Sequence, residues 1–368
     1  RGRRSARSRG PNASSTASNR WFWSSIPTMM AAKLLLWQES LRVSQVRPNS
    51  GVMNKLWDVA VIGGGAAGLS AAITLARSRR SVVVIDDHHP RNAPADRVHN
   101  YLGRESTPPS ELFDIGRGEA AQYGAAFRDA RATSVSHADN HFDVTVDCPD
   151  GTTSTVQARR VLVATGVVDE LPDIEGLAER WGRDVLHCAY CHGWEVRDRA
   201  IAVLGTGPLA VHHALLFRQL SDNVSLVRHN DFPLSPEDAA QLARRDIGVV
   251  DGPVARLRIS DDSLTAVELG TGAMLPCDAL VVATVVSAPV DMLAPLRLTA
   301  QEMRLEDHLL GTYLPVTRGA TAVPGIYAAG NVTDIKAQVI TSAAAGTEVA
   351  AIINADLAVA DAQELQHA

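Results

Sequence analysis

The sequence offers no long apolar run and few cysteines. Its best apolar stretch, residues 279–286, is far shorter than the roughly 20 residues that a membrane-spanning helix needs. Four cysteines in 368 residues are too few for the disulfide scaffold of a secreted protein. We therefore expect a soluble, cytoplasmic protein with no membrane contact.

Acidic residues are almost missing from the first fifty positions, which hold nine Lys and Arg residues but only Glu39 as an acid. This Arg- and Ser-rich segment has no periodicity, so residues 1–52 are expected to be a disordered N-terminal extension. A transit peptide has a similar composition. A reading-frame extension ahead of Met53 is favoured because Met53 leads directly into the first strand. The net charge of −6 argues against a nucleic-acid partner.

Two strand–turn–helix–strand patterns organise the rest of the chain. The first places a strand at 59–62, a helix to residue 79 and a strand at 82–85; the second places a strand at 200–204, a helix to about 220 and a strand at 224–227. Between them, a hairpin is expected over 142–161, with its turn at 149–151, before a strand at 161–164. Strands at 279–286 and 325–329 and a helix over about 340–360 are expected to follow.

These patterns predict an α/β fold with two Rossmann-like, three-layer nucleotide-binding domains, the second inserted in the first. Residues 171–186 are expected to cross between the domains. The predicted boundaries are 53–170 for the first part of the first domain, 171–278 for the inserted domain, 279–360 for the second part of the first domain and 361–368 for a tail.

The first glycine-rich turn, Gly63-Gly64-Gly65-Ala66-Ala67-Gly68, fits G-x-G-x-x-G between a strand and a helix. In such a turn the first glycine permits the tight bend, the second lets backbone N–H groups approach a pyrophosphate, and the third lets helix and strand pack closely. Asp86 ends the next strand and can accept hydrogen bonds from a ribose hydroxyl, with Asp87 as a competing choice. The turn predicts a dinucleotide site.

The second turn, Gly205-Thr206-Gly207-Pro208-Leu209-Ala210, fits the G-x-G-x-x-A variant. Its next strand ends in Arg228-His229, and an arginine there attracts a 2′-phosphate that an acid would repel, so the pattern favours NADPH over NADH. Two alternatives stay open. Arg228 and His229 are ordinary surface residues, or the domain binds no nucleotide because Pro208 lacks a backbone donor near the phosphate.

Cys188-Ala189-Tyr190-Cys191-His192 is the predicted chemical centre. Two thiols separated by two residues can close into a disulfide with little rearrangement, and a helix end lowers the pKa of the exposed thiol. His192 follows the second sulfur and can hold and release the proton that thiolate chemistry requires. Cys148 and Cys277 are expected to be free thiols.

The C-x-x-C-H motif is also compatible with three other roles: haem attachment, zinc binding and a structural disulfide. Covalent haem attachment requires an exported protein, and a position between two nucleotide folds argues against it. Zinc needs two further ligands, for which His187 and His192 are the candidates but lie very close in sequence. A structural disulfide would not turn over. We favour a redox dithiol and expect no metal site.

Over residues 57–357 the order and spacing of these motifs resemble the low-molecular-weight thioredoxin reductase family. The strand ending in Ala164-Thr165-Gly166 and the segment Gly325-Ile326-Tyr327-Ala328-Ala329-Gly330-Asn331 also match the family pattern. The resemblance implies FAD at the first turn, NADPH at the second, and a homodimer. The residues it assigns to FAD are Gly63, Gly65, Ala67, Gly68, Asp86, Asn92, Asn100, Gly166, Gly330, Asn331, Gln338 and Val339, and those it assigns to NADPH are Gly205, Gly207, Ala210, Arg228 and His229.

Three features depart from the family pattern. Asn331 stands where Asp is usual, so a ribityl contact loses charge but keeps a hydrogen-bonding group. Arg228 and His229 stand where the family has a basic cluster, which puts NADPH specificity in doubt. His192 stands where reductases serving thioredoxin carry Asp. This C-x-x-C-H-G-x-E form resembles the dithiol oxidases that close disulfides in gliotoxin and holomycin.

Three functions remain open at this point. In the first, NAD(P)H reduces FAD, which opens a Cys188–Cys191 disulfide, and the dithiol reduces a thioredoxin-like protein or another disulfide partner. In the second, a small-molecule dithiol reduces the pair and oxygen reoxidises the flavin. In the third, the chain is a non-enzymatic, flavin-binding redox sensor.

For the enzyme, Cys191 is expected to face the flavin, Cys188 to be the interchange thiol and His192 to be the proton donor. One C-x-x-C cannot face both a flavin and a partner at once. The inserted domain is therefore expected to swing about its two linkers.

Overall fold

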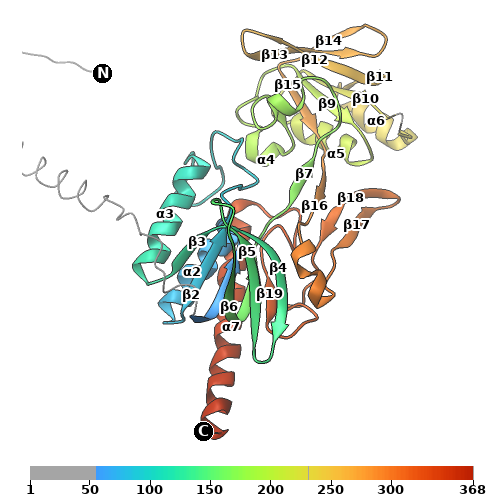
Figure 1. Ribbon diagram of the computed structural model, residues 1–368. Helices are drawn as coiled ribbons and strands as arrows, with labels where there is room; N and C mark the ends of the chain where they lie inside the picture. Colours follow the sequence, from blue (N-terminus) through green and yellow to red (C-terminus); the bar gives the residue numbers. More distant parts are fainter. Residues whose placement is uncertain (1–54, 231, 368) are drawn as a thin grey trace, which may run out of the picture. The chain divides into compact units, whose positions relative to one another are not determined.

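The computed structural model describes residues 55–230 and 232–367, and the expected N-terminal extension at 1–52 lies outside the described residues. The described chain forms two nucleotide-binding folds (Figure 1). The first fold contains β1 (Leu56–Ile62), α2 (Ala66–Arg77), β2 (Val82–Asp86), α3 (Pro109–Gln122), β3 (Ala126–Asp129), β4 (Arg131–Ala138), β5 (His141–Asp147), β6 (Thr153–Val163), η3 (Asp291–Leu296), β19 (Ile326–Ala328) and α7 (Val339–His367).

The sheet of the first fold has the strand order β3-β2-β1-β6-β5-β4, and β19 also pairs with β6. Strands β1, β2, β3, β6 and β19 are parallel, whereas β4 and β5 form an antiparallel hairpin beside them. Val59–Ile62 of β1, Val82–Ile85 of β2 and Val161–Val163 of β6 are apolar and buried because both faces of the sheet are covered there. Helices α2 and α7 cover one face, and η3 packs with the β4–β5 hairpin on the other.

The second fold has a parallel sheet of its own, with the strand order β11-β10-β9-β15-β8. Helices α5 and α6 cover one face through Ala214, Phe217 and Leu242, and a small antiparallel sheet covers the other. Its elements are η2 (Ala178–Arg180), β8 (Val185–Leu186), α4 (Ala189–His192), β9 (Ile201–Gly205), α5 (Leu209–Phe217), β10 (Val224–Arg228), α6 (Pro236–Arg244), β11 (Gly248–Asp251), β12 (Val254–Ser260), β13 (Ser263–Leu269), β14 (Met274–Pro276) and β15 (Ala279–Val282). The predicted α/β class, with one three-layer fold inserted in another, is confirmed.

Two short strands carry the chain between the folds. β7 (Val168–Glu170) leaves the first fold and β16 (Val285–Ser287) returns to it, and the two pair antiparallel and lie side by side in Figure 1. They belong to a four-stranded sheet that also holds β17 (Gln301–Leu305) and β18 (His308–Tyr313). The connection between the folds is therefore a two-stranded ribbon.

The structure corrects three expected boundaries. Residues 279–286 split into β15 and β16, which pair in different sheets, so the inserted fold extends past 278 to Val282. The expected strand at 161–164 is the end of β6 and continues the hairpin strand without a break. The expected tail from 361 is helical to His367, because Asp361 and Glu364 form ion pairs with the body of the first fold.

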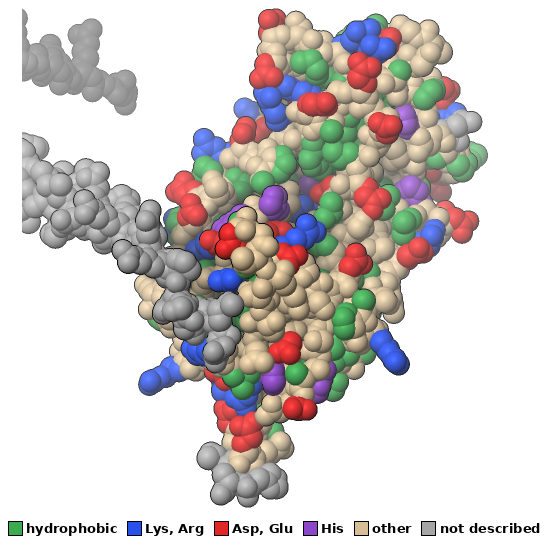
Figure 2. All heavy atoms as spheres, viewed as in Figure 1, with side chains coloured by type: hydrophobic (Ala, Val, Ile, Leu, Met, Phe, Trp, Pro, Cys, Tyr) green, Lys and Arg blue, Asp and Glu red, His purple; other side chains and the backbone are tan. Residues whose placement is uncertain are grey.

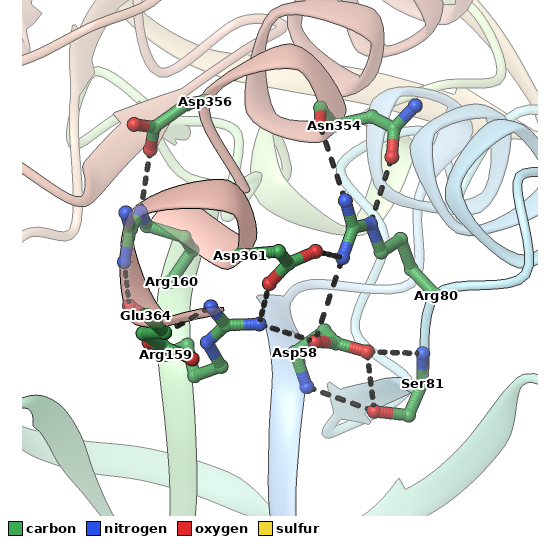
Figure 3. Close-up of polar contacts among 9 residues, drawn as sticks. All are labelled: Asp58, Arg80, Ser81, Arg159, Arg160, Asn354, Asp356, Asp361 and Glu364. Carbon is green, nitrogen blue, oxygen red and sulfur yellow. Dashed lines mark hydrogen bonds and ion pairs between the residues drawn. The ribbon is translucent and has the colours of Figure 1, made fainter. Parts of the chain in front are cut away.

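A polar network fastens the C-terminal half of α7 to the ends of β1, β2 and β6 (Figure 3). Arg159 contacts Asp361 at 2.7 Å and Asp58 at 3.1 Å. Arg80 contacts Asp361 at 2.6 Å and donates to the Asn354 side chain. The helix is therefore fixed at its polar end by charges as well as along its apolar face by packing.

The same helix corrects the expectation that no segment is long and apolar enough to cross a membrane. Residues Val339–Glu364 pass that test by length and composition. However, Ala350, Ile353 and Leu357 on α7 are fully buried against the helices and strands of the first fold. This placement is that of a core helix, which passes the same test.

Candidate dinucleotide and dithiol site

A cavity of about 870 Å³ lies where the parallel strands of the first sheet end. Ligand cavities generally measure about 300–1,000 Å³, so this one has the size that an extended cofactor needs. Its wall includes most of the residues that the sequence analysis assigned to FAD, together with two of the three predicted catalytic residues: Gly63, Gly65, Ala67, Asp86, Asn92, Gly166, Gly330, Asn331, Gln338, Val339, Cys191 and His192.

The glycines of the first turn are required by their surroundings. Gly63 has φ +106°, and a Cβ there would lie 2.4 Å from the carbonyl oxygen of Ala164. A Cβ on Gly68 would lie 1.9 Å from the Gly63 carbonyl oxygen, because strand and helix touch at this point. A Cβ on Gly65 would meet nothing within 4 Å. The open side of Gly65, at the N-terminus of α2, is where a pyrophosphate can approach backbone N–H groups.

Asp86 is held at the edge of the cavity by several contacts. The Gly64 N–H donates to its Oδ1 at 2.9 Å, and Arg117 and His88 lie 3.2 Å and 3.6 Å from its Oδ2. Asp87 also lies in the cavity wall. The bare glycine cradle, the fixed carboxylate and the size of the cavity together fit a dinucleotide cofactor.

The C-terminal segment closes the cavity on a second side. Gly330 has φ +86°, and a Cβ there would lie 2.8 Å from the Cβ of Ala67. The amide nitrogen of Asn331 donates to the carbonyl oxygens of Asp334 and Ala337 at 3.1 and 2.9 Å, so it shapes its own loop. Helix α7 begins at Val339 in the cavity wall, which brings the positive end of a long helix dipole to the site.

Two of the residues assigned to FAD by the sequence analysis lie outside the cavity wall. Asn100 is one, and its side-chain nitrogen donates to the Tyr190 carbonyl oxygen at 2.7 Å, which ties its loop to the C-x-x-C segment. Gly68 is the other, because it is buried under the turn where helix and strand pack.

The C-x-x-C motif forms a single turn of helix, α4, with Cys188 as its N-cap residue. The N–H groups of Cys191 and His192 both donate to the Cys188 carbonyl oxygen, which brings the two side chains together. The thiol of Cys191 donates to the sulfur of Cys188 at 2.7 Å. Cys191 lies in the cavity wall and Cys188 does not, so the two sulfurs face different surroundings.

The two thiols differ in acidity. The hydrogen bond from Cys191, together with backbone N–H groups of Cys191 and Tyr190 and the charge of Arg91, lowers the pKa of Cys188 to about 7 despite burial. The interaction with Cys188 and then burial raise the pKa of Cys191. A hydrogen-bonded thiol pair that shares one proton in this way leaves Cys188 as the thiolate.

Desolvated histidines surround the pair. Burial lowers the pKa of His192 against the charge of Glu195, and neither ring nitrogen has a hydrogen-bond partner. Burial also lowers the pKa of His187 to about 4, and its ring stacks on Trp181 at 5.6 Å. Both histidines are therefore neutral imidazoles near neutral pH.

The sequence analysis missed an ion pair beside the ribbon that joins the folds. Arg91 donates to both carboxylate oxygens of Asp169 on β7 at 2.7 Å, and Thr284, just before β16, donates to the same carboxylate at 2.7 Å. A loop of the first fold thereby holds both linkers. No local motif marks Arg91, because its partner Asp169 lies 78 residues away in sequence.

The second glycine turn lies between β9 and α5 and does not line this cavity. At the end of β10, the Arg228 Nε contacts Asp251 at 2.5 Å. The Nδ1 of His229 accepts from the Val254 N–H at 3.0 Å, and Ala210 is buried in the helix layer. The two side chains predicted to meet a 2′-phosphate thus have partners within their own fold.

Within residues 55–230 and 232–367, no group of three or more His, Cys, Asp or Glu side chains is arranged to hold a metal ion. All four cysteines are free thiols. The chemistry of the site therefore has to be derived from the thiols, the histidines and the cradle beside them.

Fold and site together define a class of protein. Its members have two nucleotide-binding folds and a dithiol at the wall of the cavity in the first fold. The family model described as pyridine nucleotide-disulphide oxidoreductase matches residues 57–350. This chain belongs to that family and is thioredoxin reductase-like. The family implies a flavin and a pyridine nucleotide as cofactors in general.

Individual relatives agree. The protein in the crystal structure of HlmI shares 41% sequence identity with this chain. The two structures match with a TM-score of 0.76 over 85% of this chain and 96% of that one. Thioredoxin reductase of Treponema pallidum is 29% identical over 79% of this chain and 94% of its own length. Thioredoxin reductase tcpT of Claviceps purpurea is 34% identical over 49% of this chain, and the match spans 58% of that protein.

Proposed function

We propose that this chain is an FAD-dependent oxidoreductase that interconverts dithiols and disulfides through Cys188 and Cys191. One observation carries the proposal: Cys191 and His192 lie in the wall of the same cavity as Gly65 and Val339. FAD, when bound there, supplies the two-electron chemistry that interconverts the dithiol and disulfide forms of the pair.

The residues that would hold FAD come from both parts of the first fold. The turn at Gly63–Ala67 and the N-terminus of α2 suit the pyrophosphate, and Asp86 suits a ribose. Asn92, Gly166, Gly330, Gln338 and Val339 complete the wall, and the α7 N-terminus favours negative charge there. Asn100 would act at one remove, by holding the C-x-x-C segment through Tyr190.

Cys188 is the interchange thiol in this proposal. Its thiolate attacks a partner disulfide, forms a mixed disulfide and expels the other partner sulfur as a thiolate, which takes up a proton. Cys191 then attacks the Cys188 sulfur, so that a Cys188–Cys191 disulfide forms and the partner leaves as a dithiol carrying two electrons. In the reverse direction the same bonds exchange, a substrate dithiol becomes a disulfide, and the pair is left reduced.

His192 accepts the Cys191 proton in this scheme. Because burial keeps its imidazole neutral, it can take the proton as Cys191 attacks Cys188, and it returns that proton when the bonds exchange in reverse. The sequence analysis expected a proton donor. The lowered pKa makes His192 an acceptor in the resting protein and a donor only after it has been protonated.

Electron flow has two candidate directions. In the first, NADPH at the second turn drives reduction of a thioredoxin-like protein. In the second, a small-molecule dithiol is oxidised and oxygen accepts the electrons. A neutral, buried His192 suits both directions, because Cys191 in the first and a substrate thiol in the second must lose a proton to a base before attack. The partners that Arg228 and His229 already have support the second direction.

Anaerobic reduction of the bound flavin tests the proposal. We expect a small dithiol to bleach the visible absorbance of the FAD-loaded wild type and of Cys148→Ser, a matched cysteine variant outside the cavity. Cys188→Ser and Cys191→Ser should not bleach, because each lacks one of the two exchanging sulfurs. Bleaching of Cys191→Ser by the dithiol at the wild-type rate would refute the assignment.

The same experiment with NADPH in place of the dithiol decides the direction. A thioredoxin reductase-type enzyme is bleached by NADPH, and Cys188→Ser retains that bleaching while losing disulfide reduction. A dithiol oxidase instead releases hydrogen peroxide when mixed with a dithiol and air, without NADPH. Strict dependence on NADPH would exclude the oxidase.

For location and assembly we propose a cytoplasmic homodimer without a nucleic-acid or membrane partner. A catalytic C-x-x-C is typical of compartments that keep thiols reduced. Acidic and basic side chains are interspersed over the face seen in Figure 2. Sedimentation equilibrium should give twice the chain mass, and a chain-sized particle at all concentrations would contradict the dimer.

A further inference from the structure

The second glycine turn is covered by a side chain from outside its own sheet. A Cβ placed on Gly207 would lie 2.4 Å from Cε1 of His308 and 2.7 Å from each of its ring nitrogens. Such distances are shorter than real Cβ contacts, so the imidazole fills the space that the bare glycine leaves. Gly207 is the second glycine of the motif, the position at which a pyrophosphate approaches the backbone.

His308 reaches this position from the sheet of the linker ribbon. It is the first residue of β18 and pairs with Leu305 at the end of β17, so it lies at the tip of a hairpin. Glu306 in the two-residue turn has φ 53°. The hairpin pairs through β18 with β16, the returning linker strand. The tip is therefore connected to the ribbon on which the inserted fold would turn.

The neighbouring parts of the turn are also occupied. A Cβ on Gly205 would lie 2.6 Å from a ring carbon of Phe232. Arg228 contacts Asp251 and also donates to the Phe232 carbonyl oxygen at 3.3 Å. Strand, turn and helix have the form of a dinucleotide site, but side chains occupy its mouth and its 2′-phosphate end.

We propose that His308 gates the second dinucleotide site: its imidazole occupies the pyrophosphate position on Gly207, and a nucleotide binds only after the tip of the β17–β18 hairpin withdraws. This inference rests on the proposed function in taking the second turn as the pyridine-nucleotide site. Nucleotide affinity is then reduced by the fraction of molecules in which the tip is withdrawn. Access by NAD(P)H is coupled to the ribbon that positions Cys191.

The test is calorimetric titration of the FAD-loaded protein with NADPH and, separately, NADH. His308→Ala is expected to bind one of them about tenfold or more tightly than the wild type, because the closed state no longer competes. His308→Gln, whose planar side chain has similar reach, is expected to bind as weakly as the wild type. In the His308→Ala background, Gly207→Val refills the cradle and should remove the gain.

Equal affinity of wild type and His308→Ala, including no binding by either, would overturn the gate. Weaker binding by His308→Ala would also overturn it, because His308 would then be a phosphate ligand. Flavin reduction by a dithiol, measured in parallel on the wild type, reports on the Cys pair alone. A failure of the proposed redox function is thereby separated from a failure of the gate.

Discussion

At the scale of single residues, the two sulfurs of one motif have different tasks because they have different neighbours. The Cys191 thiol donates a hydrogen bond to the Cys188 sulfur at 2.7 Å. Cys191 lies in the cavity wall, whereas Cys188 lies outside it. The sequence analysis predicted this division between flavin-facing and interchange thiols as part of the enzyme mechanism. The pKa difference between the thiols, which the same hydrogen bond causes, agrees with this division.

The acidity of Cys188 is directly measurable. Its alkylation rate by iodoacetamide should rise with pH through about 7, because the thiolate is the nucleophile and the Cys191 hydrogen bond lowers the pKa. In Cys191→Ala that hydrogen bond, the largest cause, is gone, so the midpoint should move to higher pH. Mass spectrometry of the labelled peptide follows the site, with the Cys148→Ser background as control. An unmoved midpoint in Cys191→Ala would contradict the account.

Residues that meet only in three dimensions could not be predicted. The glycine turns and the C-x-x-C have fixed local spacing, so the sequence places them correctly on their turns and on a helix start. Arg91 contacts Asp169 in sequence-distant segments, and His308 covers Gly207 from another sheet. No periodicity or spacing in one sequence records such pairings. These are the contacts that decide how the two folds are held and which site is open.

At the scale of helices and strands, local pattern predicts the βαβ units but not how long apolar runs divide. Residues 279–286 look like one buried strand. The run breaks before β16 because Thr284 donates to Asp169 and the next residues pair with β7 instead of β9. The second strand of the expected hairpin and the expected strand at 161–164 form one continuous strand, β6. The second half of β6 pairs with β1 and β19, which are distant in sequence.

The polar end of α7 contributes to stability through carboxylates with lowered pKa values. Burial alone would raise the pKa of Asp58, but hydrogen bonds from Ser81 and Arg159 and the charge of Arg80 lower it. Hydrogen bonds from Arg80 and Arg159 lower the pKa of Asp361. Groups of this kind stabilise the fold above their ordinary pKa of about 3.9, and that contribution is lost as pH falls through the lowered folded-state value.

Asp58→Asn should therefore destabilise the protein at neutral pH by about 1 kcal/mol, since it removes the carboxylate that accepts from Ser81 and Arg159 and faces Arg80. The difference from the wild type should shrink in acid, where Asp58 is protonated in both states. Thermal unfolding followed by circular dichroism at the two pH values measures this. Asp173→Asn, a change at an exposed carboxylate, is the matched control. A difference that persists or grows in acid would argue against the ion-pair explanation.

At the scale of the whole molecule, the two folds are joined so that one dithiol can react first with the flavin and then with a partner. The ribbon of β7 and β16 is the only pair of crossings within residues 55–230 and 232–367, and the Arg91–Asp169 pair holds it with Cys191 at the first cavity. The contact of Asn100 with Tyr190 adds a second tie. Release of these ties would free Cys188 for a partner, and withdrawal of His308 would open the second turn.

Absorption spectroscopy of the FAD-loaded Cys188→Ser variant tests contact between Cys191 and the flavin most directly. A thiolate touching an oxidised flavin gives a long-wavelength charge-transfer absorption, which requires direct contact. We predict that this band appears in Cys188→Ser as the pH is raised and is absent from Cys191→Ser. A band in Cys191→Ser but not in Cys188→Ser, or no band in either variant, would contradict the placement of the Cys191 sulfur at the FAD site.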